Sequence, residues 1–359
     1  MKAIVNPQQL LRELKKLSLV VRKINIIPIA GSALFQFKKD SLVIIGTDTE
    51  TIHITSLSCT CEEEFSFCID YFDIFDICSK LSAPMQILRK DNLINITSGS
   101  SKFKLSVVGE IDEFPNKIND EYTHELDVDG DFFYHLSNAN TCKSKDELRA
   151  ALSMVAIRVY KDYYDVAACD GFVLYMKKFL LKSPKEFEAM VCDKFVTLCK
   201  SFQESTLYFN EKFVKVVYKD ETIISRLSES KFANINAIIP TEINYNIVID
   251  KEELKNAVEI VGVSASGQQK EFSLSFKKGE MKLTSTILEL NKETETTVNI
   301  EHSINIEEIC LGATQLLGLI NLVQKGNINL SFTDKKKSVF INPSEDEDVV
   351  MMIQPLFAL

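Results

Sequence analysis

The sequence predicts an α+β protein made of three copies of one unit, each with two helices packed on antiparallel sheet. Two observations support this fold class. A strand that ends in a helix-capping residue occurs three times, with the caps at Asn6, Asp129 and Asp250, which stand 123 and 121 residues apart. A second apolar helix begins 64, 64 and 62 residues after these caps. The predicted domains are therefore 1–121, 122–243 and 244–359.

The first copy has the clearest helix signals. Residues Lys2–Val5 predict a short strand, and Asn6 and Gln9 have the spacing of a capping box. Pro7 suits the first helical position because that position needs no backbone N–H donor. An apolar stripe then recurs at helical spacing, at Leu10, Leu14, Leu17 and Val21. Basic residues fall on the opposite side, so this helix has an apolar face and a basic face.

The same pattern returns in the second and third copies. Asp129 is the predicted cap of the second, and Asp250 with Glu253 forms a capping box in the third. The residues expected to face inward are Phe132, Phe133 and Leu136 in the second copy, and Leu254, Ala257, Val258 and Val261 in the third. Three helices of one design are thus predicted.

A second helix in each copy tests the repeat independently. We expect these helices to open at Asp70, at Asp193 and just after Gly312. Their stripes are Ile74, Ile77, Cys78 and Leu81; Phe195, Leu198, Cys199 and Phe202; and Leu316, Leu319, Ile320 and Val323. The constant spacing from the first cap indicates a true repeat.

Alternating apolar and polar runs between the helices predict antiparallel hairpins. The first hairpins are Leu34–Phe37 with Leu42–Ile45, Val155–Tyr160 with Tyr164–Ala168, and Phe272–Phe276 with Met281–Thr284. The second hairpins are Gln86–Leu88 with Leu93–Thr97, Leu207–Phe209 with Val214–Tyr218, and Ile328–Phe332 with Val339–Ile341. Each copy therefore contributes two hairpins.

Composition narrows the class of protein. The chain has 359 residues, and its 45% hydrophobic content suffices for a sizeable core. No run of about 18 uncharged apolar residues occurs and the N-terminus lacks a signal-peptide pattern, so we expect a cytoplasmic protein. The nine scattered cysteines are interpreted as small buried hydrophobes, and the four histidines join no cluster with metal-ligand spacing.

An enzyme is one alternative that the sequence disfavours. Hydrolysis or group transfer needs a nucleophile with a base, a metal cluster or a Gly-rich phosphate loop. Only 12 glycines and four dispersed histidines are available. We expect no catalysis and no cofactor.

Charge is segregated along the chain. The net charge of −10 disfavours a protein that coats nucleic acid over its whole surface. The stretch from Leu10 to Lys23 nevertheless carries five basic residues against Glu13 alone. A basic surface on one side of an acidic protein is therefore expected.

Six short segments in order resemble the bacterial sliding clamps, the beta subunit of DNA polymerase III, over essentially the whole chain. These segments are Ile26-Ile27-Pro28-Ile29, Gly46-Thr47-Asp48, Phe75-Asp76-Ile77-Cys78, Phe103-Lys104-Leu105-Ser106, Asp112-Glu113-Phe114-Pro115 and Cys169-Asp170-Gly171. None is specific alone, but together, on a threefold repeat, they are.

The resemblance implies a head-to-tail homodimer whose six domains close into a ring, with helices lining a hole through which DNA passes. The implied partners are double-stranded DNA bound without sequence preference, a replicative polymerase and a clamp loader. The residues then expected to face DNA are Arg12, Lys15, Lys16, Arg22, Lys23, Lys143, Lys145, Arg149, Lys194, Lys200, Lys251 and Lys255. Without the resemblance, these would equally well be solvated helix faces and loops.

The resemblance also implies a hydrophobic pocket between the second and third domains that binds short peptides. Its wall would comprise Leu152, Cys169, Gly171, Phe172, Leu174, Ile238, Ser338, Met352, Ile353, Pro355 and Leu356. The chain departs from the family here: Phe172-Val173 replaces a common His-Arg pair, and Ala150-Ala151 replaces a pair of tyrosines. A more hydrophobic pocket is expected.

The dimer interface implied by the resemblance joins an edge of the first domain to an edge of the third. Its residues would be Lys102, Phe103, Lys104, Leu105, Glu289, Glu293 and Glu295. The lysines would face the glutamates. A second alternative also stays open: a diverged peptide-binding scaffold that keeps the fold and never encircles DNA.

Overall fold

The computed structural model describes residues 1–356 except 24–26, 117–120, 182–184, 241, 266, 288–289 and 302–305. The chain divides into two compact units. The first consists of Met1–Tyr134 with Val191–Glu229, and the second of His135–Met190 with Ser230–Leu359.

Most of the predicted helix caps are confirmed. In α1 (Pro7–Leu17), Asn6 accepts hydrogen bonds from the backbone N–H groups of Gln8 and Gln9. Asp70 and Asp250 cap α2 (Tyr71–Lys80) and α5 (Lys251–Gly262) in the same way. Asp129 accepts from the Phe132 N–H in α3 (Gly130–Thr141), and α6 (Ala313–Ile320) follows Gly312. Side-chain oxygens thus take up N–H groups that lack partners inside four of the helices.

The second helix of the middle copy begins at Asp193, as predicted, but its cap differs from those of the other helices. Helix α4 (Asp193–Cys199) has Cys192 as its cap residue, and Asp193 is the first helical residue. The Cys192 side chain makes no capping hydrogen bond. The carboxylate of Asp193 lies in the first turn, where its negative charge interacts favourably with the positive end of the helix dipole. Asp193 therefore supports the helix by its charge.

Unit 1 contains two antiparallel sheets. The five-stranded sheet has the order β5 (Thr60–Cys61), β1 (Lys2–Val5), β7 (Met85–Lys90), β8 (Leu93–Ser98), β9 (Ser101–Ser106). The eight-stranded sheet has the order β10 (His124–Val128), β15 (Ser205–Phe209), β16 (Phe213–Tyr218), β17 (Glu221–Arg226), β4 (Thr51–Ser58), β3 (Ser41–Thr47), β2 (Ser32–Lys38), β6 (Phe65–Asp70).

Unit 2 also contains two antiparallel sheets. The eight-stranded sheet has the order β14 (Phe187–Val191), β11 (Val155–Val159), β12 (Tyr163–Cys169), β13 (Val173–Leu180), β25 (Val349–Ile353), β24 (Val339–Pro343), β23 (Asn327–Phe332), β18 (Tyr245–Asp250). The four-stranded sheet has the order β21 (Lys292–Asn299), β20 (Glu280–Ile287), β19 (Glu271–Lys277), β22 (Ile306–Gly312). All six predicted hairpins are present.

Both eight-stranded sheets join neighbouring copies of the repeat. In unit 1, β17 of the middle copy pairs with β4 of the first, with Ile223 opposite His53. In unit 2, β13 of the middle copy pairs with β25 of the third, with Tyr175 opposite Met351. We call these two strand pairs the first junction and the second junction. The three domains thus share sheets, and the exact boundaries at 121 and 243 stay a prediction.

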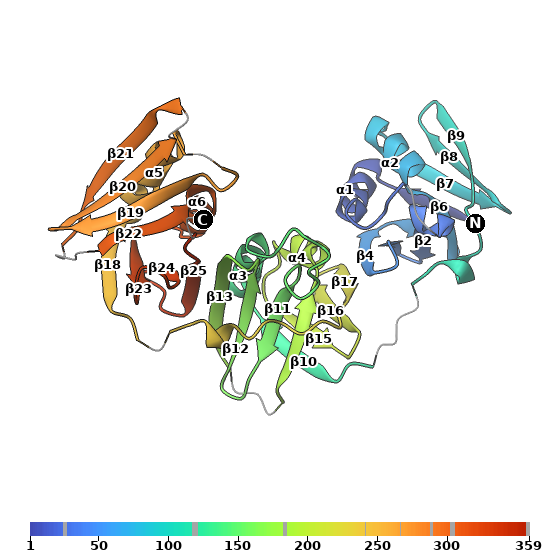
Figure 1. Ribbon diagram of the computed structural model, residues 1–359. Coiled ribbons are helices and arrows are strands. Elements are labelled where there is room, and N and C mark those ends of the chain that lie inside the picture. Colours follow the sequence, from blue (N-terminus) through green and yellow to red (C-terminus); the bar gives the residue numbers. More distant parts are fainter. Residues whose placement is uncertain are drawn as a thin grey trace. The chain divides into compact units, whose positions relative to one another are not determined.

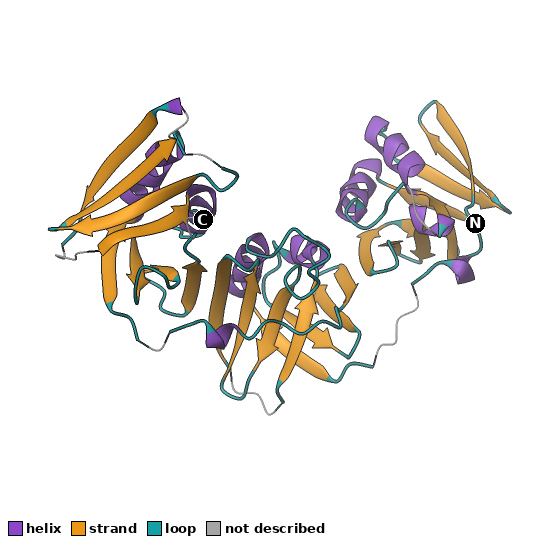
Figure 2. Cartoon of the chain, viewed as in Figure 1, coloured by secondary structure: helices purple, strands orange, loops and turns teal. Residues whose placement is uncertain are grey.

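The helices bury their apolar stripes against one face of the sheets. Helix α1 packs beside α2 and α5 beside α6, as a layer apart from the strands (Figures 1 and 2). Leu10, Leu14 and Leu17 of α1 are fully buried, as are Leu254, Val258 and Val261 of α5. Each such leucine contributes about 1.5–3 kcal/mol by burial. We call the opposite side of each sheet its outer face.

Candidate functional site

The second junction carries a row of apolar side chains on its outer face. Cys169 pairs with Leu174, Leu174 with Met352, and Met352 with Phe340. Directly paired residues of antiparallel strands point to the same side, so the four side chains form one continuous row. All four belong to one hydrophobic cluster, and Leu152 packs against it. The pairing thus assembles residues that are up to 183 positions apart in sequence.

The segment after β17 covers part of this row. Phe232 and Ile235 belong to the same cluster, and Ile235 begins the short helix η3 (Ile235–Ala237). The Phe232 N–H donates to Glu188 Oε1 at 2.9 Å, and the Arg158 guanidinium lies 5.5 Å from the Phe232 ring centre. Arg158 is itself held by two hydrogen bonds to Asp165, of 2.7 and 2.9 Å. A buried ion pair therefore supports Phe232 from below.

The rim of the row is partly exposed. Phe172 and Ile238 are 48% and 42% exposed. Asp170 Oδ1 accepts from the Phe172 and Val173 N–H groups, which fixes a tight turn. Gly171 in this turn has φ +98°, and a Cβ there would lie 3.2 Å from Arg149 Nη2, so glycine fits both the backbone and the space. Phe172 thus borders the buried apolar floor at the start of β13, and Ile238 directly precedes Ile239, which packs against the same cluster.

The C-terminal segment forms hydrogen bonds along this rim. The Gln354 N–H donates to the Phe172 carbonyl at 2.8 Å, and Gln354 Nε2 donates to Ser338 Oγ at 2.9 Å. Leu356 donates from its N–H to the Cys310 carbonyl of β22. Pro355 is buried between these two anchor points. The tail is therefore held on both sides of Pro355.

One predicted pocket residue, Ile353, lies on the opposite face of the sheet from the apolar row. Ile353 pairs with Val173 and with Val339, one residue away from the Leu174–Met352 pair, so it points to the opposite face. It is fully buried. Sequence reasoning also missed Phe340 and Ile235. The alternation along β24 marks Phe340 as a strand residue, but only strand pairing shows which face it joins.

Several basic residues that were predicted to face DNA are engaged within the chain. Lys16 Nζ lies 2.7 Å from Glu13 Oε2 and 2.8 Å from Glu221 Oε1. Burial alone would lower the pKa of Lys16, but the hydrogen bonds and charges of the two glutamates outweigh it and raise that pKa. The same contacts, with Thr55 and Arg12, lower the pKa of Glu13 against the effect of its own burial. Lys16 is thus a fixed charge that ties α1 to β17.

Other predicted DNA-facing cations also have partners among the described residues. Arg12 Nε donates to Glu13 Oε1 at 3.0 Å, although Arg12 is exposed. Lys194 pairs with Asp48. Lys251 donates to the Gln324 carbonyl at 3.3 Å and lies 3.6 Å from Glu252. Arg149 donates to the Asp170 carbonyl at 3.1 Å. The other predicted DNA-facing residues are exposed (Lys15, Arg22, Lys23, Lys145 and Lys200) or half-buried (Lys143 and Lys255).

The predicted interface residues lie on two sheet edges. β9 is the last strand of the five-stranded sheet, and its exposed Lys102 and Lys104 alternate with half-buried Phe103 and Leu105. β21 is the last strand of the four-stranded sheet and carries Glu293 and Glu295. Glu295 forms a 2.7 Å ion pair with Lys282 on the neighbouring strand. Glu289 lies outside the described residues.

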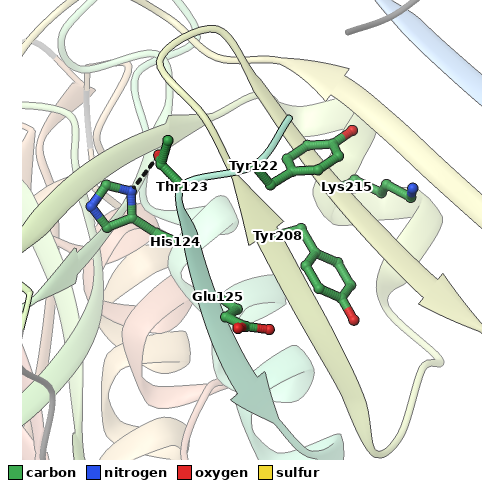
Figure 3. A pocket seen from close by; sticks show the side chains of 6 residues that line it. All are labelled: Tyr122, Thr123, His124, Glu125, Tyr208 and Lys215. Carbon is green, nitrogen blue, oxygen red and sulfur yellow. Dashed lines mark hydrogen bonds between the residues drawn. The ribbon is translucent and has the colours of Figure 1, made fainter. Parts of the chain in front are cut away.

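A polar cavity of about 340 Å³ lies elsewhere in unit 1 (Figure 3). It is lined by Tyr122, Thr123, His124, Glu125, Tyr208 and Lys215. Lys215 Nζ stands 5.3 Å from the centre of the Tyr122 ring, and the Tyr122 and Tyr208 rings are 6.0 Å apart. Sequence reasoning did not identify this cavity, because its residues show no motif.

The remaining observations concern cysteines, metals and membranes. All nine cysteines are free thiols and six are buried; burial raises the pKa of the Cys78 thiol to about 12. This fits their interpretation as small hydrophobes. Within the described residues, no group of three or more His, Cys, Asp or Glu side chains is arranged to bind a metal ion. None of the described helices is long and apolar enough to cross a membrane.

Comparison with known proteins identifies relatives over the whole chain. Two models of one family match: the DNA polymerase III beta subunit N-terminal domain over residues 1–118 and its C-terminal domain over residues 236–357. The beta sliding clamp of Haemophilus influenzae is 22% identical, with 98% of each chain covered. That of Buchnera aphidicola is 21% identical over 99% of this chain and 100% of its own.

Solved structures are similar in fold. The DNA polymerase sliding clamp of Bacillus subtilis superposes with a TM-score of 0.92 at 19% identity, and the DNA polymerase III beta subunit of Thermotoga maritima with 0.87 at 19%. Both comparisons cover 100% of each chain. The strand pairing, the threefold repeat and these matches agree: the chain belongs to the DNA polymerase III beta subunit family, the sliding clamps.

Proposed function

We propose that this protein is a DNA polymerase processivity factor, in which two chains form a closed ring around duplex DNA. The ring slides on DNA and tethers a replicative polymerase, a clamp loader and other proteins through the apolar row of the second junction. It acts in the cytoplasm as a non-catalytic subunit and needs no cofactor. The observation that carries the proposal is the pair of incomplete sheets, whose free edges match the junctions inside the chain.

Strand pairing places β21 at the position that β4 and β13 occupy in the other copies. Each of these strands follows the first hairpin of its copy. Equivalent positions beside the turns of the first hairpins are Leu42, Tyr164 and Met281. On the next strand they pair with Leu57, Phe179 and Val298, respectively. Four positions earlier stand His53, Tyr175 and Thr294. His53 and Tyr175 are the residues at the centres of the two junctions, so Thr294 is their counterpart.

The same comparison makes β9 the counterpart of β17 and β25. Each follows the second hairpin of its copy and pairs with the second strand of that hairpin. The residues three positions before the helix caps are Ala3, Leu126 and Ile247. Followed from strand to paired strand across the sheet, they lead to Phe103, Ile223 and Met351, respectively. Ile223 is opposite His53 and Met351 is opposite Tyr175. A third junction of the same kind would therefore pair Phe103 with Thr294 of the partner subunit.

This register agrees with the charges at the two edges. With Phe103 opposite the partner's Thr294, Lys102 lies opposite the partner's Glu295 and Lys104 opposite the partner's Glu293. Phe103 and Leu105 already pack against the core of their own copy. Exposed ion pairs each contribute only about 0–1 kcal/mol, so strand pairing and apolar contact stabilise the interface and the charges select the register.

Exposed cations support a DNA-facing surface of modest strength. Arg12 and Lys15 project from α1, and Lys145 and Lys200 lie in the loop after α3 and at the end of α4. Each phosphate contact adds roughly 0.9 to the slope of log affinity against log salt. A handful of such contacts on a protein of net charge −10 gives weak, sequence-independent binding. Retention on DNA must then come from encirclement.

The test is retention on DNA of different topology. Protein loaded onto a nicked circle is expected to stay bound through a high-salt wash and to leave within minutes after the circle is cut. The measurement is the fraction of labelled protein that co-elutes with DNA on gel filtration. Equal loss from circles and linear DNA would favour the alternative function, a peptide-binding scaffold that does not encircle DNA.

A further inference from the structure

The two junctions inside the chain share one backbone arrangement, so their side chains can be compared position by position. The Arg226 N–H donates to the Glu50 carbonyl at 2.8 Å, as the Gln354 N–H donates to the Phe172 carbonyl at 2.8 Å. The Ala30 N–H donates to the Ile27 carbonyl, as the Leu152 N–H donates to the Arg149 carbonyl. Each residue of the first junction therefore has a counterpart at the second. The pairs, with the first-junction residue given first, are Ile52 and Leu174, Ile224 and Met352, Glu50 and Phe172, Arg226 and Gln354, and Phe213 and Ser338.

Both junctions have an apolar floor on the outer face. Ile52 and Ile224 pair directly in the first junction, as Leu174 and Met352 do in the second. Each pair is buried within its own hydrophobic cluster. The floor alone therefore gives no reason why a peptide should bind one junction and not the other.

The side chains above the floor differ in size. At the first junction the aromatic ring of Phe213 packs against the cluster that contains Ile52 and Ile224. At the second junction the same position is Ser338, whose hydroxyl accepts a hydrogen bond from Gln354. A serine lacks the volume of a phenyl ring. The space that Phe213 fills at the first junction is thus left to other groups at the second.

The rims differ in polarity. Glu50 and Arg226 face each other across the first junction with 3.9 Å between their charged groups, and both side chains are more than half exposed. Their counterparts are Phe172 and Gln354, which are uncharged. An incoming apolar side chain would meet an aromatic surface at the second junction and a hydrated ion pair at the first.

The free edge of the four-stranded sheet lacks even the apolar floor. The counterparts of Leu174 and Cys169 there are Glu293 and Thr286. The nearby outer face holds a cavity of about 440 Å³ lined mainly by polar side chains, including Ser273, Thr284 and Glu308. This leaves the first junction as the only near match to the second among the described residues.

We propose that Phe213 closes a second, latent peptide site at the first junction, and that the Phe213 and Ser338 positions restrict the chain to one site. The ligand class is a short peptide with two large apolar side chains. The inference rests on the proposed peptide-binding function of the second junction. Phe213 acts by occupying the space above Ile52 and Ile224, and the Glu50–Arg226 pair keeps that space polar at its rim.

The test exchanges the two rims. Titration calorimetry with a synthetic peptide that carries adjacent Leu and Phe residues measures the number of peptides bound per chain. The unmodified protein is expected to bind one. The variant Glu50→Phe, Phe213→Ser, Arg226→Gln is expected to bind two, and Ser338→Phe is expected to lose at least tenfold in affinity at the original site. Phe213→Leu is the control that keeps the latent site filled and leaves one peptide per chain.

Two results would overturn the inference. One is a triple variant that still binds a single peptide while its mass and thermal unfolding match those of the unmodified protein. The other is a Ser338→Phe variant with unchanged affinity. Failure of the unmodified protein to bind any peptide is a different result, since it would contradict the proposed function of the second junction itself.

Discussion

Changing Lys102 and Lys104 to glutamate is expected to convert the proposed dimer into a monomer. In the proposed register, the two substitutions place like charges opposite Glu295 and Glu293 of the partner subunit at each interface of the ring. Each reversed pair loses an attraction of up to about 1 kcal/mol and gains a repulsion of similar size. The two pairs together change the interface by up to about 4 kcal/mol, so its affinity should fall by up to roughly a thousandfold. Light scattering at micromolar concentration measures the mass.

The proposed pairing of Lys102 with Glu295 and of Lys104 with Glu293 also predicts that complementary charge reversals restore the dimer. A chain with Glu293→Lys and Glu295→Lys should also be a monomer, and mixing it with the Lys102→Glu, Lys104→Glu chain should restore the dimer mass. Each interface of the mixed ring then pairs opposite charges. The same reversal at exposed Lys38 and Lys39, the last residue of β2 and the first of the turn after it, is the matched control and should leave the dimer intact. A mixture that remains monomeric would refute the register.

Replacing Phe172 with aspartate is expected to abolish peptide binding without affecting the fold. Phe172 is 48% exposed and stands at the rim of the apolar row, so its loss leaves no cavity in the core. Burying one large apolar side chain against this rim is worth about 1.5–3 kcal/mol, and a carboxylate there would need desolvation instead. Titration calorimetry should show at least a tenfold loss of affinity.

Leu180→Asp is the control for the effect of an added charge. Leu180 is also a large apolar residue of unit 2, is 92% exposed, and lies at the far end of β13 from Phe172. The Leu180→Asp variant should bind peptide with the same affinity as the unmodified protein. Equal affinity for all three proteins would mean that the apolar row is simply part of the core, and a fall in melting temperature for Phe172→Asp would mean that its rim supports the fold.

Local signals in the sequence sufficed for the helices and hairpins. Asn6, Asp70 and Asp250 cap helices because a short polar side chain can reach N–H groups two and three residues ahead. That geometry depends on neighbours in sequence alone. Helix α4 begins at Asp193 as predicted, but there the residue is the first helical residue and not the cap, because a carboxylate is as favourable inside the first turn as before it.

Features that depend on distant strand pairing were beyond the sequence. Lys16 has the spacing of an exposed basic helix residue, but Glu221, 205 positions later, lies within hydrogen-bonding distance of it. Ile353 and Met352 are adjacent in one strand and so point to opposite faces, but only the pairing of β25 with β13 shows which of the two joins the apolar row. The sequence named Cys169, Leu174 and Met352 of the apolar row, while the division of the neighbouring residues into floor, rim and core needed the register.

Because neighbouring copies share sheets, cleavage of the chain between the copies would expose new strand edges. Severing it at 121 and 243 would leave the middle copy with β17 and β13 as bare edges, each stripped of the neighbour it has in the intact protein. The exposed N–H and C=O groups of such edges are templates for intermolecular strand addition. β17 offers Ile223 and Ile224 to that addition, and β13 offers the apolar run from Val173 to Met176. The middle copy on its own is therefore a candidate for aggregation, and continuity of the chain serves as protection against it.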